Sequence, residues 1–172
     1  MSLLEIKDLD VGFDTPDGEV HAVNNLNFSI KSGEALALVG ESGAGKTQTA
    51  MAILGLLAEN GHVTGQALFK GKDLLGMSTT ELNERRGSEI AMIFQDPMTS
   101  LNPYLRIEKQ MTEVVMHHQA MSKAEARAKA VEMLRAVRIP DPERTIRRYP
   151  HELSGGMRQR VMVATGLLSA PD

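Results

Sequence analysis

The segment Gly40–Thr47, with the sequence GESGAGKT, constrains the fold of this 172-residue chain more than any other part of it. It matches the phosphate-loop pattern, in which a glycine-rich loop joins a buried strand to a helix and wraps around phosphate oxygens. The apolar run 35–39 comes before the loop, and an amphipathic helical pattern over 46–57 follows it, as the motif requires. The pattern therefore predicts a nucleotide-binding loop in an α/β fold.

The residue types of the loop indicate how it would hold a nucleotide and a metal ion. Glycines let backbone N–H groups point inward at phosphate oxygens, which a Cβ would obstruct. Lys46 would neutralise the β and γ phosphates, and the Thr47 hydroxyl would ligate Mg²⁺. The other expected site residues of the loop are Gly40, Glu41, Ser42, Gly43, Ala44 and Gly45. The dinucleotide pattern G-x-G-x-x-G is absent from the sequence, which argues against a Rossmann oxidoreductase.

The composition is that of an ordinary globular domain. Hydrophobic residues make up 42% and charged residues 24% of the chain, and the net charge is −3. This acidic balance indicates no general affinity for nucleic acid or for an anionic membrane. With no cysteine, the chain cannot form a disulfide. It has no signal-peptide pattern, and no apolar run approaches the ~20 residues of a membrane helix. We therefore expect a cytoplasmic protein that reaches a membrane only through a partner.

The hydrophobic periodicity divides the chain into parts of an α/β plan. Period-two alternation predicts strands near the N-terminus, and helical periodicity dominates the second half. Runs that are apolar on both faces predict buried strands at 35–39 and 89–94. The expected parts are a small antiparallel β layer at about 1–34 and 61–76, a P-loop core at 35–60 and 88–96, a helical subdomain at 97–153 and a last helix at 154–170.

Local turn and cap signals predict several boundaries between these elements. Thr15–Gly18, with the sequence TPDG, has the chemistry of a hairpin turn. Ser78–Glu81 and Ser122–Glu125 are capping boxes that would open helices. Pro140–Pro142 would stop the second of these helices. Residues 63–74 should form short strands broken by glycines.

Two neighbouring residues after the run 89–94 are alternative site residues. In a simple P-loop kinase or GTPase, an apolar strand ending in an acid would supply Asp96 to help hold Mg²⁺. Alternatively, the neutral amide of Gln95 would reach Mg²⁺ or the attacking water. Spacing alone does not decide between them.

The string Leu153–Arg160, LSGGMRQR, is the second distinctive motif. Ser154 is a good helix N-cap. Gly155 and Gly156 leave backbone N–H groups uncovered at the helix start, which predicts a second anion site. Ser-Gly-Gly by itself would be unremarkable at a helix start, whereas the full string is far more specific.

In combination, these motifs resemble those of the ATP-binding subunits of ABC transporters. Gly40–Thr47 is similar to their Walker A motif, Gln95 to their Q-loop and Leu153–Arg160 to their signature motif, in the family's order. The strings FQDPMTSLNP at 94–103 and YPHELSGG at 149–156 are similar to the oligopeptide/dipeptide importer branch. The likeness spans nearly the whole chain.

The resemblance implies how ATP and Mg²⁺ would be held. Phe13 would stack on the adenine, although a strand residue that packs inward is the alternative. Gln95 would be directed at the γ-phosphate and its Mg²⁺. Ser154, Gly155 and Gly156 would cover the ATP that is bound to the Walker A motif of a second subunit.

The resemblance also implies partners and a location. The working unit would be a dimer of ATP-binding subunits, identical or not, attached to membrane-spanning permease subunits on the inner face of the cell membrane. The segment 97–105 would face the cytoplasmic loops of the permease. Tyr104 and Leu105 are equally suited to the core of the helical subdomain. No nucleic-acid partner is expected.

The implied function is to power peptide import by ATP binding and hydrolysis. The family's next elements, a strand ending in Asp-Glu, a D-loop and a switch histidine, would follow Asp172, so we expect a fragment that does not hydrolyse ATP by itself. One alternative is a small P-loop kinase or GTPase that uses Asp96, which would leave Leu153–Arg160 without a purpose. Another is a non-catalytic nucleotide-binding module. A DNA-repair ATPase of the same family is disfavoured by the acidic balance.

Two further clusters are typical of structural roles. His117 and His118 are adjacent on a predicted helix and point to different faces, which argues against joint metal ligation. Arg144, Arg147 and Arg148 form a small basic cluster, which is more typical of a solvated face than of a ligand site.

Overall fold

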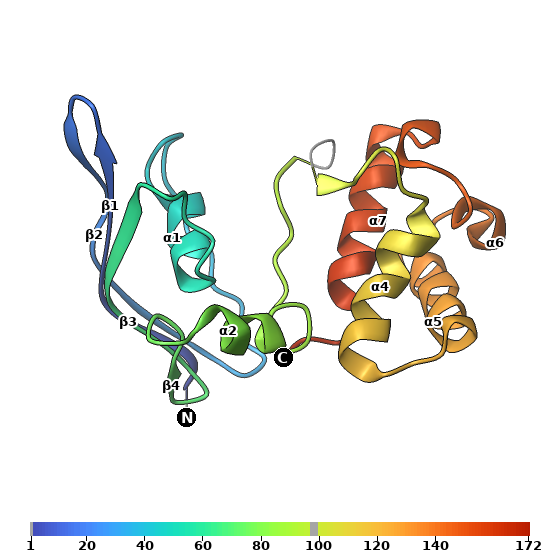
Figure 1. Cartoon of the computed structure of the whole chain (residues 1–172), viewed down its shortest axis with the longest axis horizontal. Coiled ribbons are helices and arrows are strands. Elements are labelled where there is room, and N and C mark those ends of the chain that lie inside the picture. The colour runs from blue at the N-terminus through green and yellow to red at the C-terminus, as the bar shows by residue number, and fades with distance from the viewer. Residues whose placement is uncertain (1, 97–99) are drawn as a thin grey trace. The chain divides into compact units, whose positions relative to one another are not determined.

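The computed structural model describes residues 2–96 and 100–172. The chain forms two compact units, Met1–Asn83 and Glu84–Asp172. Strands dominate the first unit and helices the second (Figure 1). Within the described residues, no helix has both the length and the apolar character needed to cross a membrane.

The first unit is built on a four-stranded antiparallel sheet with the strand order β2-β1-β3-β4 (Figure 1). Its strands are β1 (Ser2–Thr15), β2 (Gly18–Lys31), β3 (Gly61–Phe69) and β4 (Lys72–Asp73). The predicted turn joins β1 to β2, and there the Thr15 hydroxyl donates a 2.6 Å hydrogen bond to the Gly18 carbonyl. The predicted antiparallel layer and its hairpin turn are therefore confirmed.

Bulges bend the two long strands of this sheet. Asp8 and Asn25 have positive φ angles of 47° and 44° at the irregular points of the β1–β2 ladder. The Asp8 N–H donates to Asn27 Oδ1 at 2.9 Å, and the Asn25 N–H donates to Asp10 Oδ1 at 3.0 Å. Gly65 of β3 has φ +96°, and a Cβ there would lie 2.3 Å from the Asp8 carbonyl oxygen. The prediction that this glycine breaks a strand is wrong, because β3 uses it to pass the bulge.

Helix α1 (Lys46–Ile53) contacts β1 and β2 and buries Ala52 and Ile53. It ends four residues before the predicted limit of the pattern 46–57. Gly55 takes up a positive φ of 63°, and the Leu56 N–H bonds to the Met51 carbonyl at 2.8 Å. This arrangement is a typical helix C-cap, which explains the earlier end.

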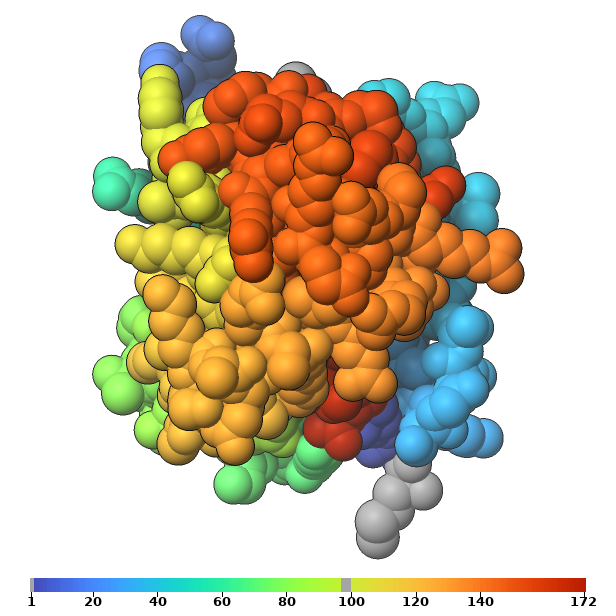
Figure 2. All heavy atoms as spheres, turned by 90° about the vertical axis from the view of Figure 1, so that its right-hand side faces the viewer, coloured from blue at the N-terminus to red at the C-terminus, as the bar shows by residue number. Residues whose placement is uncertain are grey.

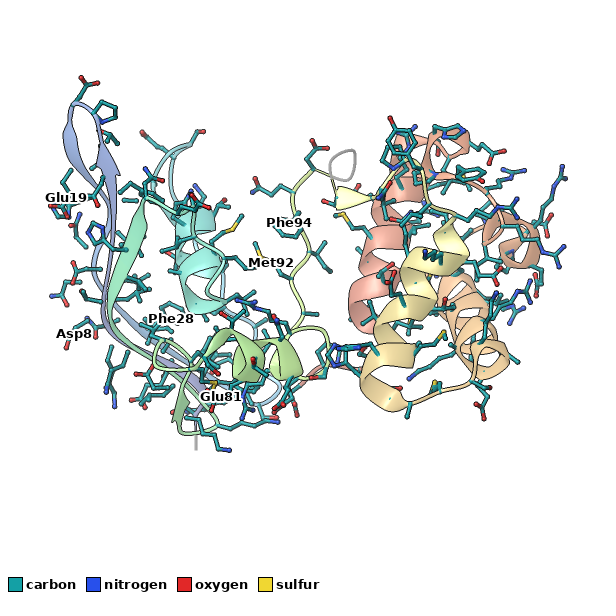
Figure 3. All side chains as sticks on the ribbon, in the orientation of Figure 1. Asp8, Glu19, Phe28, Glu81, Met92 and Phe94 are labelled. Carbon is teal, nitrogen blue, oxygen red and sulfur yellow. The ribbon has the colours of Figure 1, made fainter. Side chains whose placement is uncertain are left out.

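Helix α2 (Thr79–Arg85) follows the sheet and begins at a predicted capping box. The Ser78 N–H donates to Glu81 Oε2 at 2.8 Å, and the Glu81 N–H donates to Ser78 Oγ at 3.3 Å. Figure 3 labels Glu81 at the start of this helix. The prediction of a capped helix at this position is confirmed.

Neither of the buried strands predicted for the P-loop core is formed. Residues 34–41 belong to no helix or strand, and Val39 is 93% exposed. Residues 91–94 have no regular structure either, and Phe94 is 41% exposed (Figure 3). A parallel strand needs hydrogen-bonded neighbours, and no strand of the described residues pairs with either segment. The two strand predictions are therefore wrong for this structure.

The second unit is a group of helices around one apolar core (Figure 1). Its elements are α4 (Ile107–Gln119), α5 (Lys123–Ala136), α6 (Pro142–Thr145), the short 3-10 helix η1 (Pro150–Glu152) and α7 (Gly155–Leu167). Helices α4, α5 and α7 contact one another. Their fully buried residues include Met111, Leu134 and Val161, and the C-cap residue Leu168 of α7 is fully buried as well. The predicted helical character of the second half of the chain is thus confirmed.

The loop before α4 carries the segment that we expect to face a permease. Residues 97–99 of that segment lie outside the described residues. Tyr104 is 87% exposed, so the alternative that it belongs to the core is wrong, whereas Leu105 is half-buried.

Candidate nucleotide-binding site

The glycine-rich loop 40–45 lies directly before α1, and its carbonyl groups bind the side chain of Lys46. Lys46 Nζ donates hydrogen bonds to the Gly40 carbonyl at 2.7 Å and to the Glu41 carbonyl at 2.5 Å. The Ala44 N–H bonds to the Glu41 carbonyl at 3.2 Å, which tightens the loop. The loop carbonyls therefore hold the ammonium group beside the loop backbone.

The fold explains why the loop needs glycine next to the lysine. Gly45 has φ +79°, and a Cβ there would lie 2.2 Å from the Ala22 carbonyl oxygen and 3.1 Å from Val23 Cγ2. Gly43 also has a positive φ, of 86°, but a Cβ there would meet nothing within 4 Å. Strand β2 thus shapes the end of the loop, and this contact with Ala22 and Val23 was missed by sequence reasoning because it joins distant parts of the chain.

Helix α1 begins directly after the loop. The Thr49 N–H and hydroxyl both bond to the Gly45 carbonyl, at 2.8 and 3.0 Å. The N–H groups of the first helical residues precede this bond and have no helical partner one turn back. They carry the positive end of the helix dipole. The N–H groups of the first turn of α1, the Lys46 ammonium group and the exposed Thr47 hydroxyl form a donor set that fits a phosphate chain with Mg²⁺.

The second predicted anion site lies at the start of α7. Ser154 is the N-cap, and its Oγ accepts a 3.4 Å hydrogen bond from the Met157 N–H. A Cβ added at Gly155 or Gly156 would meet nothing within 4 Å. Arg158 Nε donates to the carbonyls of Pro150 and Leu153, at 2.8 and 3.1 Å, and so holds the entry to the helix. The predicted N-cap is confirmed, and the helix start is uncovered within its unit.

A family model described as ABC transporter matches residues 23–172. The chain belongs to the ABC transporter family. This finding confirms the resemblance that the motifs indicated.

Curated relatives of this ABC transporter family member carry peptide-transport names. The chain is 57% identical over 170 residues to the oligopeptide transport ATP-binding protein OppD of Escherichia coli. The match covers 99% of this chain and 50% of that protein. The chain is 48% identical over 172 residues to the dipeptide transport ATP-binding protein DppD of Lactococcus lactis, with 99% and 49% covered. The chain therefore spans about half the length of these relatives.

Solved structures of ABC proteins have the same fold. The chain is similar to the dimeric ATP-binding cassette MJ0796 in a post-hydrolysis state bound to ADP and Pi, with a TM-score of 0.86 and 26% sequence identity. The match covers 98% of this chain and 70% of that chain. CbiO1 from Clostridium perfringens, part of the ABC transporter complex cbiONQ, has a TM-score of 0.72 at 25% identity, with 99% and 62% covered. The predicted fold class, a P-loop α/β fold of ABC type with an antiparallel layer and helices, is confirmed.

Phe13, the predicted adenine contact of this ABC protein, lies in β1 opposite Val20 of β2 and Gly61 of β3. A Cβ at Gly61 would lie 2.8 Å from Phe13 Cε1, so the aromatic ring covers this glycine. The ring is half-buried. This packing accounts for one contact of the ring, and stacking on adenine stays a prediction.

Gln95 and Asp96 are both exposed and lie in the second unit, whereas the phosphate loop lies in the first. The Asp96 carbonyl accepts a 2.7 Å hydrogen bond from Ser100 Oγ. This bond uses the backbone and not the carboxylate. Which of the two side chains serves the γ-phosphate in this ABC protein stays a prediction.

The adjacent histidines of α4 lie edge to face, with the ring centroids of His117 and His118 4.8 Å apart. Among residues 2–96 and 100–172, no group of three or more histidine, aspartate or glutamate side chains is arranged to hold a metal ion.

Proposed function

We propose that this chain is the ATP-binding part of a subunit that powers an ABC importer for oligopeptides or dipeptides. The loop 40–45 around Lys46, at the start of α1, carries the proposal. It offers an ammonium group and helix N–H groups to the same anion. The peptide-transport names of the relatives support the class of solute.

ATP would be held by the first unit. Lys46 would exchange its two carbonyl bonds for the β and γ phosphates, and the residues Gly40, Glu41, Ser42, Gly43, Ala44 and Gly45 would add backbone contacts. Phe13 would stack on the adenine. Thr47 and Gln95 would hold Mg²⁺, which when bound supplies positive charge that neutralises the phosphate oxygens.

The signature segment would act on a second ATP-binding subunit, identical or not. The uncovered start of α7 supports this role, because Ser154, Gly155 and Gly156 leave room for a phosphate of the partner's nucleotide. The solved relative MJ0796 is described as dimeric. The sequence predicts parts with boundaries near 34, 60, 96 and 153. With these boundaries, the phosphate loop would belong to the P-loop core, and the signature segment would lie at the start of the last helix.

The permease would be contacted by the segment around 97–105, which would locate the subunit on the cytoplasmic face of the membrane. Residues 1–172 contain two candidate phosphate-binding motifs, but we assign none of their glutamates to the activation of water. We therefore infer that hydrolysis requires an acidic residue outside residues 1–172 and a partner subunit.

The experiment is a titration of the 172-residue chain with a fluorescent ATP analogue and Mg²⁺. Lys46→Ala should weaken binding several-fold or more, because charge-assisted hydrogen bonds contribute roughly 1.5–3 kcal/mol. The matched control is Lys31→Ala, which removes an exposed lysine of the same unit and should leave the affinity unchanged. Phosphate release measured on the same samples should stay at background.

Equal affinities of the wild type and Lys46→Ala would contradict nucleotide binding at this loop. Sustained phosphate release that disappears in Lys46→Ala would contradict the hydrolysis part of the proposal. It would show that residues 1–172 already contain a group that activates water. Asp96 would then be the first residue to replace.

A further inference from the structure

A hollow of about 730 Å³ in the second unit is lined by four arginines. We call it the basic hollow, and its arginines are Arg106, Arg144, Arg147 and Arg148. We propose that the basic hollow binds a carboxylate-rich segment of a partner protein. None of the described residues that line the basic hollow belongs to Gly40–Thr47 or to Leu153–Arg160, so the inference goes beyond the proposed function.

Three of these arginines lack the carboxylate partners that others in the unit have. Arg85, Arg127 and Arg135 form ion pairs with Glu89, Glu108 and Glu143, at 2.6, 3.4 and 2.5 Å respectively. Within the described part of the chain, no ion pair involves Arg144, Arg147 or Arg148. Their guanidinium groups are therefore open to a carboxylate of an external ligand.

Glu152, the acidic side chain among the described residues that line the basic hollow, already has a structural role. Glu152 Oε2 accepts a 2.7 Å hydrogen bond from the Tyr149 N–H and so caps η1. One carboxylate among four guanidinium groups neutralises only part of the local positive charge. The hollow stays basic, although the chain as a whole has a net charge of −3.

Buried neighbours fix the segment that carries the arginines. Thr145 and Ile146 lie between them and are 2% and 0% exposed. The Ile146 carbonyl accepts from the Glu108 N–H at 2.8 Å, and the Arg148 carbonyl accepts from the Ile107 N–H at 3.0 Å. These bonds tie the segment to the start of α4. A partner therefore meets a backbone that is already ordered, which lowers the entropy lost on binding.

An aromatic stack forms part of the same lining. The rings of Tyr149 and His151 are stacked, with centroids 5.5 Å apart and planes 10° from parallel. Arg106 Cζ lies 5.5 Å from the centre of the Tyr149 ring. Arginine beside tyrosine is the composition typical of the central part of protein interfaces.

The chemistry of the hollow favours protein carboxylates over other anions. Planar guanidinium groups bind carboxylates through two parallel hydrogen bonds, and several of them around one hollow suit a segment with closely spaced Asp or Glu. Membrane binding through basic clusters is typical of flexible or amphipathic segments, whereas this one is a tied turn around α6. The acidic net charge disfavours a nucleic acid. Figure 2 shows atoms of the segment around α6, in orange, at the surface of the second unit.

The test measures binding of a fluorescein-labelled Glu-rich peptide to the 172-residue chain by fluorescence anisotropy. The variant Arg144→Glu/Arg147→Glu should bind the peptide about tenfold more weakly, because two exposed charge pairs are lost and replaced by repulsion. The control variant Lys109→Glu/Lys123→Glu reverses the same number of charges in the first turns of α4 and α5, and should keep the wild-type affinity. A matched peptide with Gln in place of Glu should not bind.

Three results would overturn the proposal. The first is an equal loss of affinity in both variants, which would indicate attraction by overall charge. The second is binding of the Gln peptide as tight as that of the Glu peptide. The third is binding to phosphatidylglycerol vesicles that is tighter than binding to the Glu-rich peptide and that Arg144→Glu/Arg147→Glu abolishes. This result would identify a lipid site. Circular dichroism spectra show whether each variant is folded. If Arg144→Glu/Arg147→Glu is not folded, the neutral variant Arg144→Gln/Arg147→Gln takes its place and should bind the Glu-rich peptide about threefold more weakly than the wild type.

Discussion

Gly45 lies where the phosphate loop comes close to the sheet. Its backbone has φ +79°, and β2 passes so near that a Cβ would lie 2.2 Å from the Ala22 carbonyl oxygen. Gly43 has a similar φ of +86° but faces open space. Substitutions at the two glycines therefore distinguish the effect of backbone conformation on stability from the effect of steric contact.

We expect Gly45→Ala to lower the free energy of unfolding by more than Gly43→Ala. Both substitutions force an alanine into the left-handed region, which costs about 1–2 kcal/mol. Gly45→Ala must also displace the β2 backbone, which adds about 1–3 kcal/mol. Urea unfolding followed by circular dichroism measures both values. Equal unfolding midpoints for the two variants would contradict the close contact with Ala22.

At the scale of elements, the capping box of α5 connects helix stability to pH. The Glu125 N–H donates to Ser122 Oγ at 3.3 Å, and the Ser122 N–H donates to Glu125 Oε2 at 3.0 Å. The hydrogen bond from the Ser122 side chain, followed by that from its backbone, lowers the pKa of Glu125 below its ordinary value of 4.5. The cap therefore stabilises the folded state fully above about pH 4.5, and this contribution is lost as the pH falls through the lower folded-state pKa.

We expect Ser122→Ala to raise the pKa of Glu125 toward 4.5 and to destabilise the second unit at neutral pH. The difference in stability between wild type and variant should shrink as the pH falls below 4.5, because protonated Glu125 no longer accepts the same bonds. An NMR titration of the Glu125 carboxyl group measures the pKa. Ser122→Thr keeps the hydroxyl and should keep the pKa low. A pKa that is unchanged in Ser122→Ala would contradict this role of the cap.

At the scale of the whole molecule, each unit has its own buried core. Leu9 of β1 is 0% exposed in the first unit, and Leu134 of α5 is 0% exposed in the second. Truncation of either side chain leaves a cavity among neighbours of the same unit. Such substitutions typically lower the free energy of unfolding by about 2–5 kcal/mol.

We expect Leu134→Ala to speed amide hydrogen exchange in α4, α5 and α7, with little change in β1 and β3. Leu9→Ala should have the reverse effect, because each core stabilises the elements packed around it. Hydrogen exchange followed by mass spectrometry on both variants measures these patterns. If both variants accelerate exchange over the whole chain to the same extent, the two units unfold as one.

The sequence by itself determined the features that depend on neighbouring residues. The turn at Thr15–Gly18, the capping boxes at Ser78 and Ser122, and the Ser154 N-cap lie where the sequence predicted them. Each depends on hydrogen bonds between residues a few positions apart, so a short window contains all the necessary information. The phosphate loop and the signature string likewise identified the family, since each motif is contiguous.

The tertiary structure decided the features that need a distant partner. The runs 35–39 and 89–94 have the composition of buried strands, yet a strand forms only where another strand supplies hydrogen bonds, and composition does not specify that neighbour. The requirement for glycine at position 45 includes a contact with Ala22, and the basic hollow joins Arg106 to Arg144. These pairs are far apart in the sequence, and only the folding of the backbone brings them together.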